Sequence, residues 1–325
     1  MLLFLSNTTN PAFNLAAEEW FFKNLKENII FLYKNSSAVI IGKHQNALRE
    51  INLRYLREHK IPIFRRLSGG GTVYHDPGNI NFCFIKNGTE GNLINFKEFT
   101  APIIQILINH GIKASLGTKN EILADGLKVS GNAEHIVKTR VLHHGTLLFD
   151  TDLKRLEMAI SGDESQFADK AVRSNRSSVQ NLNHYFPELN SADDFLMLIK
   201  SQLFLCFPDL EEMNLLPAAE EAITELAASK YSNEDWTYGY SPDYQFTKTS
   251  ILNNFAFEIQ LSVSKSMISS ITIKTPYPED EILAIAKALK GIKHHPEKLL
   301  QALNKTAYLT IWSFTSREAF CEMLY

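Results

Sequence analysis

The stretch Phe64–Asn79 reads FRRLSGGGTVYHDPGN and sets three consecutive glycines between an arginine pair and a Thr-Val-Tyr-His run typical of a β-strand. Glycine lets another molecule approach the main chain closely, and successive exposed amide groups form a concavity that suits phosphate or carboxylate oxygens. Neighbouring strand residues point to opposite faces, so one of Arg65 and Arg66 can face the loop and offer forked donors to an anion. The stretch predicts an anion site between two strands; a connecting turn without a ligand is the alternative. It matches neither Walker A nor GxGxxG.

The composition of the chain bounds its class. Its 325 residues are 45% hydrophobic and 21% charged, which indicates a soluble globular protein with one large and one smaller domain. A net charge of −3 gives no overall attraction to nucleic acid or to anionic membranes. No apolar run approaches the roughly twenty residues of a membrane span, and the first residues make a poor signal peptide. Cys83, Cys206 and Cys321 are too scattered for a zinc site or a disulfide framework, which favours a reducing, cytoplasmic location.

Outward from the glycines, strands and helices alternate as far as residue 245. We expect strands of apolar and β-branched residues at 2–6, 29–34, 38–43, 61–65, 72–75, 80–85, 122–124, 127–129 and 142–149. Helical spacing predicts helices that begin at Pro11 and cover 53–59, 99–110, 153–160, 192–206 and 218–229. Beyond residue 245 a hairpin (255–263 with 267–274) precedes helices at 278–289, 296–303 and 316–324. The prediction is an α/β (α+β) domain over 1–245 with mixed sheets and flanking helices, and a small α+β domain over 246–325.

A second motif is DGLKVSGNA, Asp125–Ala133. Asp125-Gly126 is a hairpin signal, and Lys128 follows it between two apolar strand residues. An edge-strand lysine that faces water is the plain interpretation. The functional one is an ammonium that reaches into a pocket as a fixed positive charge, because Ser130 and Gly131 add a hydroxyl and a bare stretch of backbone. Such a group would hold a carboxylate or a phosphoryl group.

Two further motifs are ambiguous. His143 and His144 are adjacent on a predicted strand, so they point to opposite faces and cannot easily chelate one metal ion. No other ligand cluster supports a metal, and we predict none; His144, beside Gly145, is the better candidate for a pocket wall. The polar, basic segment 171–179 has the composition of a solvated loop.

Taken in order, RRLSGGGTVYHDPGNINF, GLKVSGNAEH, HHGTLLFDTDL and VRSNRSSVQNL resemble lipoate–protein ligases of the bacterial type. The resemblance covers about residues 65 to 182, and the Trp236–Gly239 segment agrees with the family's layout. It implies the biotin/lipoate-ligase fold, with the small C-terminal domain over the site. It also implies a two-step reaction, in which lipoate and Mg²⁺-ATP form lipoyl-adenylate and the lipoyl group then passes to a carrier lysine.

The resemblance also implies site residues. Adenylate contacts fall on Arg66, Gly71, Thr72, Val73, Tyr74, Lys128 and Arg173. Lipoate contacts fall on Ser68, Gly69, Gly70, Gly71, His75, Asn120, Lys128, Ser130, Gly131, His144 and Thr146. Lys128 is the catalytic residue, because it can bridge carboxylate and phosphate oxygens as negative charge builds up. Mg²⁺ would be held mainly by the nucleotide.

The implied partners are lipoyl-carrier domains of 2-oxo acid dehydrogenase acyltransferase subunits and the glycine-cleavage H protein. An ATP-independent octanoyl- or lipoyl-transferase of the same fold is the nearest alternative, and it would use a cysteine as acyl carrier. Neither Cys83 nor Cys206 lies where that nucleophile is expected. Biotin–protein ligase has a glycine loop richer in arginine than SGGGTV. A non-enzymatic lipoyl-binding protein is the alternative from another class, and the intact Lys128 and glycine loop speak against it.

Overall fold

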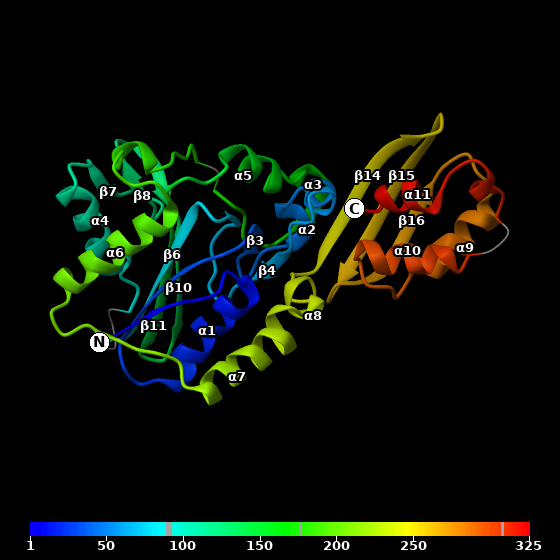
Figure 1. The fold of residues 1–325 in the computed structure, drawn as a ribbon. Helices are drawn as coiled ribbons and strands as arrows, with labels where there is room; N and C mark the ends of the chain where they lie inside the picture. The colour runs from blue at the N-terminus through cyan, green and yellow to red at the C-terminus, as the bar shows by residue number, and fades with distance from the viewer. Residues whose placement is uncertain (89–92, 176, 307–308) are drawn as a thin grey trace.

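The computed structural model describes residues 1–88, 93–175, 177–306 and 309–325. It shows an elongated molecule with a larger body at the N-terminal end of the chain and a smaller one at the C-terminal end (Figure 1). The predicted mixed α/β architecture is confirmed.

The larger body is built on a six-stranded sheet in the order β10-β11-β6-β2-β1-β13. β1 (Leu2–Leu5) runs parallel to β2 (Ile29–Lys34) and β13 (Glu211–Glu212). β6 (Asn79–Asn87), β11 (Arg140–Leu148) and β10 (Asn132–Val137) continue the sheet with antiparallel pairing.

Helices cover both faces of this sheet, because its central strands are apolar on both sides. In β2, Ile30 and Leu32 pack with α4 (Phe96–Asn109) and α6 (Ala192–Cys206). Phe31 and Tyr33, which alternate with them, pack with α1 (Pro11–Asn24) and α7 (Pro217–Leu226) on the opposite face. Both layers are visible in Figure 1.

Two small sheets beside the large one carry the motifs of the sequence. One has the order β4-β3-β5, with β3 (Ala38–Ile41) between β4 (Ile63–Arg65) and β5 (Val73–His75). The other has the order β7-β8-β9, from Ala114–Leu116, Ile122–Ala124 and Leu127–Ser130. Short helices flank them: α2 (Ala47–Glu50), α3 (Leu53–Glu58), α5 (Leu153–Ala159) and α8 (Glu234–Thr237).

The smaller body has its own hydrophobic cluster, which includes Phe246, Ile259 and Ile285. Its sheet has the order β12-β14-β15-β16, from Phe167–Asp169, Tyr244–Leu252, Phe255–Ser264 and Met267–Lys274. Three helices pack on it: α9 (Glu279–Leu289), α10 (Pro296–Asn304) and α11 (Arg317–Glu322). β12 comes from the middle of the chain, so this sheet draws on residues from both sides of position 245. The predicted boundary there stays a prediction.

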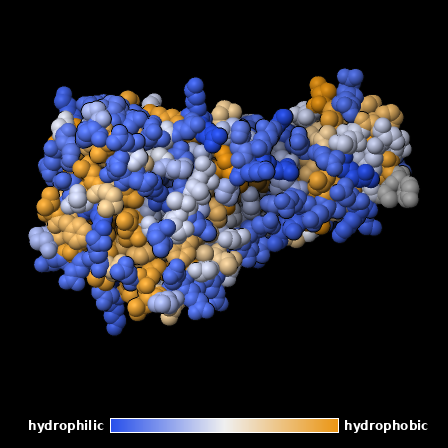
Figure 2. Space-filling model, in the orientation of Figure 1, coloured by the Kyte–Doolittle hydropathy of each residue, from blue (hydrophilic) through white to orange (hydrophobic). Residues whose placement is uncertain are grey.

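The surface is mainly polar. Figure 2 shows hydrophilic side chains over most of the visible face of both bodies, with apolar side chains exposed chiefly on the larger one. Within the described residues, no helix is both long enough and apolar enough to cross a membrane.

Candidate active site

The three glycines form the turn between β4 and β5, and the turn lies against the end of β3. Gly70 adopts a left-handed backbone, with φ of +81°. A Cβ added at Gly42, which follows β3, would lie only 2.1 Å from the carbonyl oxygen of Gly70. Glycine is therefore required at Gly70 by conformation and at Gly42 by the close approach of two backbones.

The arginine pair diverges as strand alternation predicts. Arg65 turns away from the loop and donates to the carbonyls of Trp236 and Thr237. Arg66 turns toward it and donates from Nη2 to the carbonyls of Gly69 (2.5 Å) and Gly71 (2.8 Å). Burial lowers the pKa of Arg66 to about 10, which still leaves it charged at neutral pH. In this structure the Arg66 guanidinium therefore stabilises the conformation of the glycine loop by holding two of its carbonyl groups.

A buried hydrogen-bond chain holds the other side of Arg66. Its Nε donates to Ser68 Oγ (2.9 Å), which lies 2.6 Å from His144 Nε2. His144 Nδ1 lies 2.8 Å from a carboxylate oxygen of Glu18, and the Tyr33 hydroxyl donates to the same carboxylate. The carboxylate can only accept, so Nδ1 carries a proton and, in the neutral ring, Ser68 donates to Nε2. The chain connects the anionic Glu18 to the cationic Arg66 and fixes the loop in one arrangement.

Lys128 lines the same cavity as the three glycines. Its backbone belongs to β9, and its ammonium lies next to Gly131, where an added Cβ would be 3.4 Å from Nζ. Within the described parts of the chain, no carboxylate forms a salt bridge with it. Burial lowers the pKa of Lys128, and the charges of Lys119 and Arg66 lower it further, whereas Glu121 opposes the shift. A half-buried ammonium without a bound counter-ion is ready to pair with an anionic ligand.

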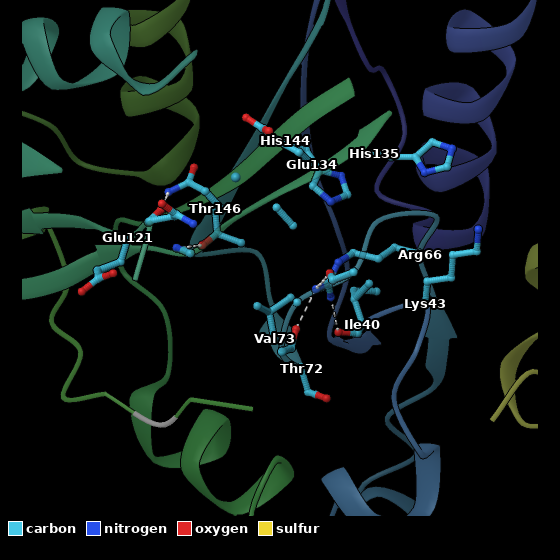
Figure 3. Close-up of a pocket in the computed structure, with 18 of the residues that line it drawn as sticks. Ile40, Lys43, Arg66, Thr72, Val73, Glu121, Glu134, His135, His144 and Thr146 are labelled. Carbon is cyan, nitrogen blue, oxygen red and sulfur yellow. Dashed lines mark hydrogen bonds between the residues drawn. The ribbon is translucent and has the colours of Figure 1, made fainter. Parts of the chain in front are cut away.

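These groups surround a cavity of about 600 Å³. Figure 3 shows Arg66, Lys43 and Ile40 on one side of it, Glu121 and Thr146 on the other, and His144 between them. The predicted site residues that line the cavity are Arg66, Gly69, Gly70, Gly71, Thr72, Val73, His75, Asn120, Lys128, Gly131, His144 and Thr146.

The structure places four predicted site residues elsewhere. Ser68 and Ser130 are buried behind the cavity wall, where they bond to other side chains. Tyr74 points away from the cavity into a small core with Val39, as expected for the residue between Val73 and His75. It borders a neighbouring pocket that shares Lys128 and Gly131 with the main one. Arg173 is exposed to solvent. Arg176, in the same motif, lies outside the described residues.

The segment 171–179 is predicted to be a solvated loop, but Ser174 within it is anchored to the residue that follows the three glycines. Ser174 Oγ accepts from the backbone N–H of Thr72 (2.9 Å) and from Gln45 Nε2 (3.0 Å). Ser174 also donates to the buried carboxylate of Glu50. Sequence reasoning missed these residues, since a lone serine, glutamine or glutamate carries no local signal of a site.

Further residues missed from the sequence line the cavity, among them Lys43, Glu121, Glu134 and His135. Burial raises the pKa of Glu134 to about 7. The carboxylate oxygen Oε2 of Glu121 is buried and has no hydrogen-bond partner among the described residues. Oε2 of Glu134, on the same cavity wall, is likewise buried without a partner in the described parts of the chain, so two of the carboxylates that line the cavity each keep an unpaired oxygen.

Comparison with known protein families gives two matches. The family described as lipoyl protein ligase A/B catalytic domain matches residues 10–204, and bacterial lipoate protein ligase C-terminus matches residues 241–324. Lipoate-protein ligase LplJ of Bacillus subtilis is 31% identical over 331 residues, with both chains covered completely. Lipoate–protein ligase 1 of Staphylococcus aureus is 33% identical over 303 residues, covering 92% of each chain.

Solved structures agree with these matches. A putative lipoate protein ligase from Thermoplasma acidophilum with bound lipoic acid has a TM-score of 0.62 at 25% identity and covers 73% of this chain and 98% of its own. Lipoate-protein ligase A bound with ATP has a TM-score of 0.63 at 25% identity, with coverages of 74% and 98%. A third structure comes from a study of an archaeal lipoylation system, a bi-partite lipoate protein ligase and its E2 lipoyl domain from Thermoplasma acidophilum. It has a TM-score of 0.63 at 26% identity and covers 73% of this chain and 96% of its own. The chain belongs to the lipoate–protein ligase family.

Proposed function

We propose that this protein is an ATP-dependent lipoate–protein ligase. It activates the carboxylate of lipoate as lipoyl-adenylate, with release of pyrophosphate, and then transfers the lipoyl group to the ε-amine of a lysine on a carrier domain. The observation that carries the proposal is the Lys128 ammonium, half-buried beside Gly131 on the cavity wall and without a salt bridge to any described residue. Relatives solved with lipoic acid and with ATP support both substrates.

Adenylation brings an anionic carboxylate to an anionic α-phosphate, so the site must neutralise charge. Lys128 serves this need by pairing with both oxygens, and its attraction grows as negative charge develops between them. The amides of the glycine loop and the hydroxyl of Thr146, which accepts from the N–H of Gly131 and keeps its own proton, add neutral donors. Arg66 contributes its charge at short range while it holds the loop carbonyls.

The cavity also fits a magnesium ion that travels with the nucleotide. Mg²⁺ takes hard oxygen ligands and is commonly bound through one or two carboxylates plus substrate phosphates. The unpaired Oε2 of Glu121 is such an oxygen, and Asn120 lies beside it on the cavity wall. When bound there, the ion would screen the phosphate charge. We assign Glu121 as its protein ligand.

The acyl acceptors that we propose are lipoyl-carrier domains of 2-oxo acid dehydrogenase acyltransferase subunits and the glycine-cleavage H protein. The archaeal relative solved within a system that includes an E2 lipoyl domain supports the first of these. All three cysteines are free thiols, which supports a reducing cytoplasmic location.

The cysteine-dependent transferase remains the alternative to test, and the thiols disfavour it. Burial, with the charge of Glu18, raises the pKa of Cys83 well above its usual range. Burial also raises the pKa of Cys206 and takes that of Cys321 to about 12. A thiol with a raised pKa is a poor nucleophile at neutral pH, because the thiolate is the reactive form.

Pyrophosphate exchange tests the proposal. With lipoate and Mg²⁺-ATP, the protein with Cys83, Cys206 and Cys321 all replaced by serine should exchange labelled pyrophosphate into ATP at close to the wild-type rate. It should also still lipoylate a carrier domain. An acyl-cysteine transferase would show no lipoate-dependent exchange and would lose transfer in the serine variant.

A further inference from the structure

His75 presents an unused hydrogen-bond donor at the cavity. It is the last residue of β5, its side chain is buried, and it lines the cavity with Tyr33 and Asn81. Its Nε2 has no hydrogen-bond partner among the described residues. Leaving a buried polar group unpaired is costly, so such a group calls for a ligand atom.

Buried asparagines behind the cavity wall decide which atoms donate. The Asn14 side chain lies 3.1 Å from the carbonyl of Thr8 and 3.0 Å from that of Lys34. Carbonyls only accept, so the Asn14 atom that faces them is its amide nitrogen. The same nitrogen is 2.8 Å from the side chain of Asn35, which must therefore present its oxygen there. The nitrogen of Asn35 is left to face the other way.

That nitrogen lies 2.9 Å from Nδ1 of His75. Since an amide nitrogen only donates, Nδ1 must accept, and the proton of the neutral imidazole sits on Nε2. Burial, followed by the positive charge of Arg66, holds the pKa of His75 at about 3, so the ring is neutral at working pH. Nε2, the nitrogen without a partner, lies on the edge of the ring that is turned away from Asn35. His75 is thus a fixed N–H donor in one tautomer.

The position of this donor along the cavity follows from the strand. Val73 and His75 point to the same face of β5, about 6.6 Å apart. Val73 lies near Gly131, beside the ammonium of Lys128, which holds the carboxylate of the substrate in the proposed function. Lipoate has four methylene groups between its carboxylate and its dithiolane ring, a span comparable with that spacing. A carboxylate at Lys128 therefore brings the ring to the level of His75.

We propose that Nε2–H of His75 donates a hydrogen bond to a dithiolane sulfur and thereby makes the site prefer lipoate to straight-chain acids such as octanoate. The inference rests on the proposed function. Sulfur is a weak acceptor, but a saturated chain offers no acceptor at all and leaves the donor unpaired. A site built around a donor rejects the analogue that lacks the matching acceptor.

The test compares lipoate with octanoate in pyrophosphate exchange, using the wild-type protein and His75→Phe. Phenylalanine keeps the ring shape and removes the donor, so kcat/KM for lipoate should fall relative to octanoate on the order of tenfold. The exposed His184, changed to phenylalanine, is the matched control and should keep the wild-type ratio. Equal losses for both acids in His75→Phe would overturn the proposal, because they would place His75 at the carboxylate or in the scaffold.

A second measurement needs no variant. The ¹⁵N resonances of His75 in the wild-type protein should show an unprotonated Nδ1 and a protonated Nε2, and lipoate should shift Nε2 while octanoate should not. A protonated Nδ1, or equal shifts with both acids, would overturn the assignment. Absence of exchange with either acid in the wild-type protein would instead refute the proposed ligase function, so the two failures are distinguishable.

Discussion

At the scale of single residues, Lys128 gives the sharpest expectation. In the proposed mechanism Lys128→Ala removes a charge that pairs with both oxyanions, so lipoate-dependent pyrophosphate exchange should fall on the order of a hundredfold or more. Lys128→Arg should rescue poorly, because a planar fork cannot occupy the place of a point charge next to Gly131. Thermal midpoints should match the wild type, and Lys154→Ala, on the exposed side of α5, serves as control. Near-normal exchange in Lys128→Ala would refute the mechanism.

Gly70 gives a second expectation at this scale. Its φ of +81° is closed to β-branched residues, and an added Cβ would lie 3.1 Å from Nη2 of Arg66. Gly70→Val should therefore disturb the Arg66 clamp on the loop and weaken both lipoate binding and adenylation. Titration calorimetry with lipoate, followed by the exchange assay, measures the two effects. Unchanged lipoate affinity would mean that the loop is only a connector.

The residues that the sequence could and could not predict differ in one respect. Lys128, His144 and the glycines stand in short motifs whose local chemistry is unusual, so their candidacy is visible without a structure. Glu18 and Ser174 contact the same site from remote positions in the chain. Their role depends on tertiary contacts across more than a hundred residues, which no local pattern records.

At the scale of elements, His294 connects strand β14 to the end of the chain in the smaller body. Its Nδ1 accepts from the hydroxyl of Tyr244 on β14 (2.7 Å), and its Nε2 donates to the carbonyl of Leu324 after α11. Burial lowers the pKa of His294 to about 4, below the ordinary value of 6.5. The unfolded chain binds a proton between these values and the folded one does not. Stability from this group is therefore complete above pH 6.5 and is lost as pH falls toward 4.

We expect this loss to reach about 3 kcal/mol near pH 4, from a shift of two to three pKa units. His294→Gln should be less stable at pH 7 and should show a shallower decline on acidification. Urea unfolding at several pH values measures both effects, and the difference between the two proteins isolates His294 from the other buried histidines. Parallel pH profiles would contradict the assignment.

Element prediction succeeded where patterns were local. Asp125 and Gly126 have φ of +47° and +83°, as a two-residue hairpin turn requires, and they connect β8 to β9. Helix α6 has the predicted bounds, whereas α4 begins three residues early because Asn95 caps it. Strands β7, β10, β12, β13 and β14 were missed. Of these, β10 and β12 are edge strands of mixed polarity, and each owes its extended form to a single neighbouring strand.

At the scale of the whole molecule, the fold class was predictable because alternating strands and helices of this length favour layered α/β bodies. Which strands pair with one another in each sheet could not be predicted. β2 and β3 follow one another along the chain with one short turn between them, yet they belong to different sheets. Their partners are chosen by long-range packing, since both strands are apolar on every side and no alternation fixes a register.

The pairing of β12 with β14 has a consequence for how the protein can be divided. A chain cut at 245 would fall inside β14, so most of that strand would be separated from β12, and each piece would then carry a bare strand edge. An exposed edge strand promotes association, because its unpaired backbone N–H and C=O groups can pair with any extended segment of another chain. Fragments made separately should therefore reassemble with one another when mixed, and aggregate when kept apart. The two bodies are therefore joined by strand pairing between β12 and β14, and not only by the chain that connects them.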